Sequence, residues 1–76
     1  MTQLNIMLHT INDVKEFVNI VSLYSFDIDL ISGRYTVDAK SIIGIFSLDL
    51  SKPLQLNIHS DDCDELLAKL QRFAFV

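Results

Sequence analysis

The spacing of hydrophobic residues changes several times along the chain, and this constrains the fold more than any other feature. Residues 2–8 alternate between apolar and polar side chains, as in a half-buried strand. After residue 10 the apolar residues fall three or four apart, with Ile11, Val14, Val18 and Val21 on one face. That spacing is typical of an amphipathic helix. The chain therefore begins with a strand followed by a helix.

Alternation returns in three later segments, residues 26–30, 35–38 and 54–59, which we interpret as strands. Ser32 and Gly33 lie between the first two, where a tight turn needs a positive φ, so these two strands form a hairpin. Residues 41–48 are apolar on nearly every side, which allows a buried strand or a short helix. We favour a helix there.

Helix starts are marked by residues that can accept hydrogen bonds from free N–H groups. Thr10 is the expected N-cap of the first helix, with Asp13 adding favourable charge to its first turn. Ser41 is the expected N-cap of the short helix. Residues 60–62, Ser-Asp-Asp, are expected to supply the cap and first-turn acids of a last helix, which buries Leu66, Leu67 and Leu70.

The resulting order is strand, helix, strand, strand, short helix, strand, helix. Four alternating strands and three one-sided helices predict a two-layer α+β domain, in which helices cover one face of the sheet. A chain of 76 residues, half of them hydrophobic, is expected to form a single domain over residues 1–76.

Charge and cysteine content exclude several classes of function. Six basic and ten acidic residues give a net charge of −4, which argues against binding to nucleic acid or to a membrane surface. One cysteine forms no internal disulfide, so we expect a cytoplasmic protein. Two histidines and this cysteine, scattered along the chain, predict no metal site, and no cofactor is expected.

One segment resembles a known family. Residues 32–43, Ser-Gly-Arg-Tyr-Thr-Val-Asp-Ala-Lys-Ser-Ile-Ile, are similar to the hairpin and Ala-Lys-Ser segment of HPr, the phosphocarrier of the bacterial sugar phosphotransferase system, and the similarity extends over nearly the whole chain. The resemblance implies an open-faced β-sandwich of βαββαβα order. Its four-stranded antiparallel sheet has the order 1-4-2-3, and three helices lie on one face. It also implies a phosphoryl carrier at most, and not an enzyme.

The chain departs from that family at the phosphorylation site. In HPr, the phosphorylated histidine caps the first helix and is followed by Thr-Arg-Pro. Aligned through Phe17 and Val18, the histidine position falls on Thr10 and the arginine position on Asn12, while His9 lies one place too early. We therefore expect a degenerate member with no catalytic residue. The alternative is an active phosphocarrier that accepts phosphate on His9.

The resemblance also implies a regulatory site and a partner surface. In Gram-positive HPr proteins, the serine that corresponds to Ser41 is phosphorylated by a dedicated kinase, and the product binds a transcriptional regulator. Other proteins of the phosphotransferase system are the further partners implied. The expected partner-binding residues surround the two helix starts: Thr10, Asn12, Lys40, Ile42, Ile43 and Phe46. An equal alternative buries the short helix between sheet and loops.

Three further features have ordinary structural explanations. We expect Cys63 to be a buried thiol and His59 to be structural or solvated. The apolar tail, residues 73–76, is expected to fold back on the core or to cover a second subunit. The chain is thus expected to be a monomer or a weak homodimer. A further alternative for the whole chain is a ligand-binding domain of ACT type, whose sheet would have the order 4-1-3-2.

Overall fold

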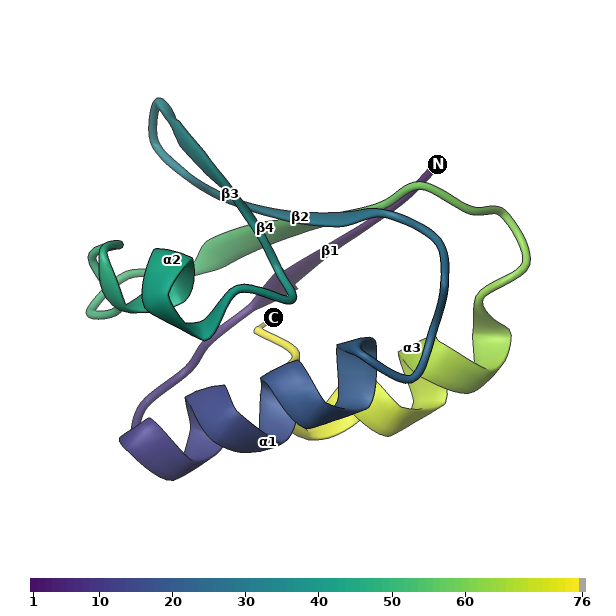
Figure 1. Cartoon of the computed structure of the whole chain (residues 1–76), viewed down its shortest axis with the longest axis horizontal. Coiled ribbons are helices and arrows are strands. Elements are labelled where there is room, and N and C mark those ends of the chain that lie inside the picture. The colour runs from purple at the N-terminus through teal and green to yellow at the C-terminus, as the bar shows by residue number, and fades with distance from the viewer. Residues whose placement is uncertain (76) are drawn as a thin grey trace.

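A computed structural model describes residues 1–75 of the chain as a four-stranded antiparallel sheet with three helices. The elements are β1 (Thr2–Ile6), α1 (Ile11–Val21), β2 (Ile28–Ser32), β3 (Tyr35–Asp38), α2 (Ile42–Phe46), β4 (Leu54–Ile58) and α3 (Asp64–Leu70), followed by a 3-10 turn at Gln71–Phe73. The strand order is β1-β4-β2-β3. Figure 1 shows α1 and α3 side by side under the sheet, with α2 beside the β2–β3 hairpin. The predicted α+β fold and sheet order are confirmed, and the ACT order is wrong.

The centre of the sheet is β4, which pairs with β1 on one side and with β2 on the other. Leu56 lies opposite Leu4 of β1 and opposite Leu30 of β2, so one row of leucines crosses three strands. Alternation along β4 buries Leu54, Leu56 and Ile58 toward the helices. Such cross-strand apolar pairs fix the register, because a slip of one residue would expose the whole row.

A single hydrophobic core lies between the sheet and the helices. Within it, the rings of Phe17 and Phe73 meet edge to face at 6.0 Å and 86°. The buried hydrophobic residues are Ile6, Leu8, Val14, Phe17, Val21, Ile28, Leu30, Ala39, Ile45, Leu54, Leu56, Ile58, Cys63, Leu66, Leu70 and Phe73. Every helix and strand except β3 contributes to this list, and β3 adds the partly buried Val37.

The buried face of α1 differs from the one predicted. The structure buries Val14, Phe17 and Val21, whereas Ile11 is 64% exposed. Ile11 is the first residue of the helix, and its side chain stays largely in solvent. The predicted stripe was therefore wrong at its first position, although the helix itself is confirmed.

The predicted cap of the last helix was also wrong. Cys63 is the N-cap of α3, and Asp64 and Glu65 are the acids of its first turn. The hydroxyl of Ser60 instead accepts a hydrogen bond from the N–H of Asp62 in the preceding loop. None of the helices described in residues 1–75 is long and apolar enough to cross a membrane.

The C-terminal segment folds back on the outer edge of β1. The N–H of Met7 donates to the carbonyl of Phe73, and the N–H of Phe75 donates to the carbonyl of Asn5, each at 2.8 Å. Ala74 forms an antiparallel bridge with Ile6. These bonds satisfy backbone groups of an edge strand that would otherwise be open to pairing. Of the predicted tail, Val76 lies outside the described residues.

Candidate functional site

The start of α1 is closed by reciprocal hydrogen bonds between Thr10 and Asp13. Thr10 has an extended backbone, and its hydroxyl accepts the N–H of Asp13 at 3.0 Å. The carboxylate of Asp13 in turn accepts the N–H of Thr10 at 3.3 Å and that of His9 at 2.9 Å. This is a capping box, with Asp in the place usually taken by Glu. Thr10 is thus confirmed as the N-cap, and Asp13 also binds the backbone directly.

These contacts make Asp13 a stable anion. The N–H of His9 is the largest cause that lowers the pKa of Asp13, and the Thr10 N–H, the nearby His9 and the Thr10 hydroxyl act in the same direction. Burial raises the pKa of Asp13 but is outweighed. The carboxylate is therefore ionised at neutral pH and already neutralises the positive end of α1. A second anion placed there would face like charge.

Residues 9–12 include no lysine or arginine to offset the negative charge of Asp13. His9 is exposed and lies just before the N-cap, so its ring does not take the capping position. Asn12, at the position that the resemblance assigns to arginine, is exposed and uncharged. The first basic side chain in α1 is Lys15, beyond the first turn. The start of α1 thus holds an internal anion and lacks a guanidinium.

The start of α2 is capped by Ser41, as predicted. Its hydroxyl oxygen accepts the N–H of Gly44 at 3.1 Å, and Ser41 is exposed. Lys40, next to it, is half-buried, and its ammonium donates to the carbonyls of Tyr24 at 2.7 Å and Phe26 at 3.0 Å. Lys40 therefore ties the start of α2 to the α1–β2 loop, and its ammonium is not directed at Ser41.

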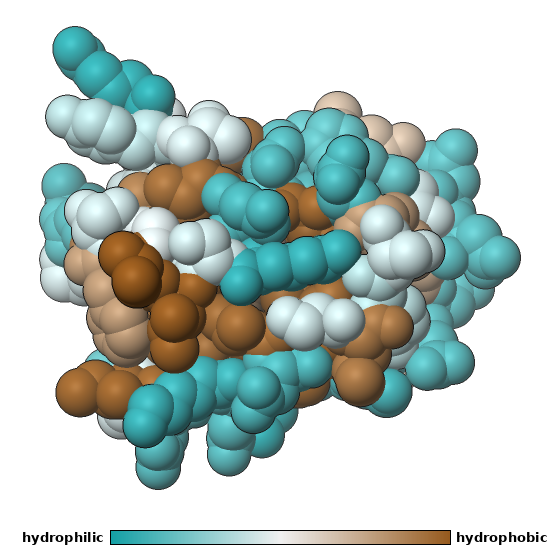
Figure 2. Space-filling model, in the orientation of Figure 1, coloured by the Kyte–Doolittle hydropathy of each residue, from teal (hydrophilic) through white to brown (hydrophobic). Residues whose placement is uncertain are grey.

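Three large hydrophobic side chains are exposed on α2 and at the start of α1. Ile43 is 81% exposed, Ile11 64% and Phe46 44%. The helices that carry them contact each other, and Figure 2 shows hydrophobic surface gathered over α2 and toward the start of α1. We call Ile11, Ile43 and Phe46 the apolar patch. On α2 only Ile45 is fully buried, and Ile42 is half-buried. One side of this helix is therefore buried against the core, and the other side is exposed, as expected of a partner surface.

Ile11 is the residue of this surface that the sequence analysis missed. It fits the helical spacing of the predicted stripe, which assigned it to the core. Phe17, however, completes a stripe with Val14 and Val21 that needs no residue from the first turn. That second stripe was the available signal, because it accounts for the buried face of α1 without Ile11.

The remaining candidates lie away from this region. The Nε2 atom of His59 is 2.8 Å from a carboxylate oxygen of Asp29, on the face of the sheet opposite the helices. Cys63 is buried, as expected. In residues 1–75, no group of three or more His, Cys, Asp or Glu side chains is arranged to hold a metal ion.

Comparison with known proteins points to one family. The family described as "PTS-HPr, PTS HPr component phosphorylation site" matches residues 11–74. The structure is similar to HPr-C-His from Thermoanaerobacter tengcongensis, with TM-score 0.75, 28% identity, and coverage of 95% of this chain and 92% of that one. It is also similar to the phosphocarrier protein HPr from Bacillus anthracis strain Ames, with TM-score 0.72, 23% identity, and coverage of 97% and 96%. A search of curated protein sequences gave no significant match.

The capping box predicts a specific pH dependence of stability. Because the folded-state pKa of Asp13 is lowered, its contribution is complete above the unfolded pKa and is lost as the pH falls through the folded value. We expect Asp13→Asn to lower the free energy of unfolding at pH 7 by about 1 kcal/mol. The difference from wild type should shrink below pH about 4. Urea unfolding at several pH values measures it.

Asp27→Asn is the matched control, since Asp27 is an exposed acid outside any helix. We expect its stability to follow wild type across the same pH range. A difference between Asp13→Asn and wild type that stayed constant down to pH 2 would contradict the role assigned to the ionised carboxylate.

Proposed function

The chain belongs to the HPr family, and we propose that it acts there as a protein-interaction module of the sugar phosphotransferase system that carries no phosphate on histidine. Its fold is that of the HPr phosphocarriers. We further propose that residues 1–76 form a single cytoplasmic domain, which is not an enzyme and binds other proteins, as a monomer or weak homodimer. Nucleic acid and membranes are not among the proposed partners, because the net charge is −4.

The observation that carries this proposal is the carboxylate of Asp13 on the first turn of α1. A phosphohistidine carries close to two negative charges and needs helix N–H groups or a cation to hold it. Here Asp13 accepts the N–H groups of His9 and Thr10, and Asn12 supplies no positive charge. A phosphoryl group at this helix start would displace the carboxylate or lie beside it, and either arrangement is unfavourable.

Phosphotransfer from phosphoenolpyruvate tests the proposal. We expect no acid-labile phosphate on the wild-type chain when it is incubated with phosphoenolpyruvate and the system's general phosphotransferase enzyme. The variant Thr10→His, Ile11→Thr, Asn12→Arg, Asp13→Pro restores the family motif at the positions given by the alignment. We expect it to become labelled, because the carboxylate is removed and a guanidinium is added. Intact-protein mass spectrometry at alkaline pH measures both.

His9→Ala is the control that separates the two functions. Labelling of the wild type that disappears in His9→Ala would establish the alternative, an active phosphocarrier using His9, and would refute our proposal. An unlabelled wild type together with a labelled motif variant supports it, since the partner enzyme then recognises the scaffold and only the acceptor is missing.

The proposed partner surface is the apolar patch. Its three side chains are exposed, although residues of the same types are buried in the core. They lie on α1 and α2, which contact each other: Ile11, Ile43 and Phe46. Monomeric proteins rarely expose several large hydrophobic side chains next to one another. Such a group therefore indicates a binding site for another protein. Thr10 and Asn12, both exposed, supply polar groups at the edge of the patch.

Disruption of the patch should weaken partner binding. We expect Ile43→Asp to weaken binding of the general phosphotransferase enzyme by about thirtyfold, which corresponds to loss of about 2 kcal/mol at a central contact. Leu23→Asp is the matched control, because Leu23 is 70% exposed but lies beyond the opposite end of α1. Calorimetric titration measures both. Equal affinities of the two variants would contradict the assignment of the surface.

Ser41 supports a second proposed role, regulation by phosphorylation. Its hydroxyl is exposed and caps α2, where a phosphate would face free N–H groups. Because the ammonium of Lys40 is bound to two carbonyls, such a phosphate would depend on the helix N–H groups alone. A serine kinase and a transcriptional regulator are then the proposed partners.

Kinase labelling tests this role. We expect incubation with the serine kinase of Gram-positive HPr proteins and ATP to add one phosphate to the wild type and none to Ser41→Ala. Ser47→Ala, at the other end of α2, should be labelled like the wild type. Phosphate that persists on Ser41→Ala, or a wild type that stays unlabelled, would exclude this regulation.

A further inference from the structure

A cavity at the hairpin end of the molecule is separate from the apolar patch and from the start of α1. It has a volume of about 720 Å³ and lies between the β2–β3 hairpin and the α2–β4 loop. We call it the hairpin pocket. Its lining residues include Ser32, Arg34, Tyr35, Val37, Leu48, Asp49 and Lys52. Its volume is in the range of pockets that bind small molecules.

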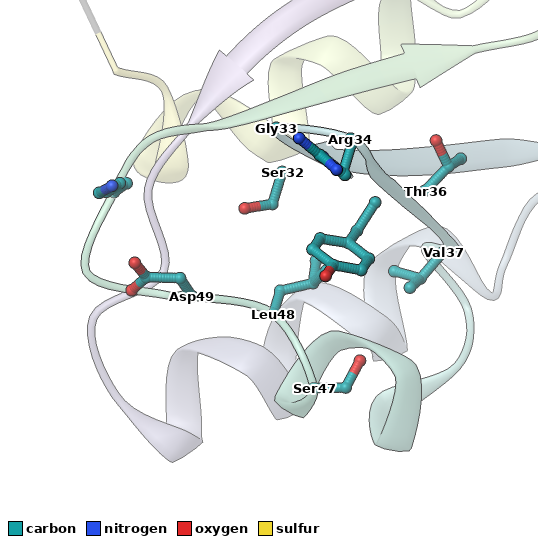
Figure 3. Close-up of a pocket in the computed structure, with 10 residues that line it drawn as sticks. Ser32, Gly33, Arg34, Thr36, Val37, Ser47, Leu48 and Asp49 are labelled. Carbon is teal, nitrogen blue, oxygen red and sulfur yellow. The ribbon is translucent and has the colours of Figure 1, made fainter.

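The pocket lies where the helices cover the sheet only in part. Val37 of the hairpin packs beside Gly44 of α2, whereas Tyr35, nearer the tip of the hairpin, stays largely in solvent. Figure 3 shows Val37 and Leu48 pointing toward a common space, with Thr36 pointing away from it. Tyr35 remains 67% exposed. The floor is therefore apolar, although solvent reaches it.

Two of the side chains that line the pocket, Arg34 and Lys52, are cations. Among residues 1–75, Arg34 and Lys52 form no salt bridge, whereas Arg72 pairs with Glu16 and Lys69 with Glu65. Figure 3 places the Arg34 side chain at one rim of the pocket and Asp49 at the opposite rim. The net charge of the chain is −4, whereas these two cations make the electrostatic potential at the pocket locally positive.

Asp49 opposes this charge only in part. One of its carboxylate oxygens accepts both the hydroxyl of Ser51 at 2.5 Å and the N–H of Ser51 at 3.0 Å. These bonds and the positive charge of Lys52 lower the pKa of Asp49, so it is ionised at neutral pH. The formal charge of Arg34, Lys52 and Asp49 together is +1, which favours an anion of single or double charge.

We propose that the hairpin pocket binds a small organic anion, whose carboxylate or phosphate group contacts Arg34 and Lys52 and whose apolar body lies on Tyr35, Val37 and Leu48. The guanidinium of Arg34 suits the planar, two-pronged geometry of such groups. The hydroxyl of Ser32 adds a hydrogen-bonding group to the same space. This binding does not depend on the proposed function, because no residue of the capping box or the apolar patch lines the pocket.

Three probes distinguish the cationic part of the site from its apolar part. Phenyl phosphate offers both an anion and an apolar ring, inorganic phosphate only the anion, and benzyl alcohol only the ring. Titration into the ¹⁵N-labelled chain, followed by amide chemical shifts, should show saturable binding of phenyl phosphate with a Kd on the order of 1 mM. The shifts should be confined to residues 32–37 and 47–52. Inorganic phosphate and benzyl alcohol should each bind at least about fivefold more weakly, since each lacks one part of the ligand.

Variants assign the contacts. Arg34→Gln and Lys52→Gln should each weaken phenyl phosphate by about fivefold. Asp49→Asn should strengthen it by about twofold, because the repulsion is removed while an amide oxygen can still accept from Ser51. Lys15→Gln is the matched control, an exposed lysine outside the pocket. All four positions are exposed, so we expect each substitution to leave the fold intact. The amide spectra of the variants check this.

Two results would overturn the proposal. One is the absence of saturable shifts in the pocket, or an Arg34→Gln, Lys52→Gln double variant that binds as tightly as Lys15→Gln. The other is equal binding of inorganic phosphate and phenyl phosphate, which would remove the apolar body from the assignment. Neither result would bear on phosphotransfer or on the apolar patch, so the outcomes are distinguishable.

Discussion

Burial of one face of the sheet is the constraint from which the arrangement of the candidate sites follows. The leucine row across β1, β4 and β2 can be removed from water only if the helices lie on that side. α1 and α3 cover the middle of the row, and the short α2 covers only part of the hairpin end. The start of α1, the exposed side of α2 and the hairpin pocket are the places where this coverage ends. Candidate sites therefore gather at the margins of the helical layer.

A single interaction at the start of α1 links the stability of the helix to the proposed absence of phosphoryl transfer. A helix start offers few free N–H groups, and an anion that binds them stabilises the helix, whether it is a side chain or a phosphate. In this chain, Asp13 is that anion and is held by the N–H groups of His9 and Thr10. A permanent carboxylate stabilises α1 at all times, whereas a transferable phosphate would do so only while it is bound. A phosphoryl group at the same helix start would meet the carboxylate of Asp13 as a like charge.

Local patterns predicted the fold and the caps of α1 and α2, while the cap of α3 and the contacts between distant segments escaped them. Thr10, Ser41 and the positive φ of Gly33 follow from residue preferences within a few positions. Ile11 was misassigned because two overlapping stripes satisfy helical spacing, and only packing selects one. The bonds from Lys40 to the carbonyls of Tyr24 and Phe26 join segments 14 and 16 residues apart. No spacing rule predicts contacts of that kind.

The distribution of the six cations shows where the chain can still recognise anions. Arg72 and Lys69 are paired with acids, and the ammonium of Lys40 is bound to backbone carbonyls. These three side chains are therefore not available to bind an anion at the first turn of α1 or at Ser41. Of the three side chains that remain, Lys15 is exposed on α1, while Arg34 and Lys52 both line the hairpin pocket. The hairpin pocket is thus lined by two cations that form no salt bridge within residues 1–75.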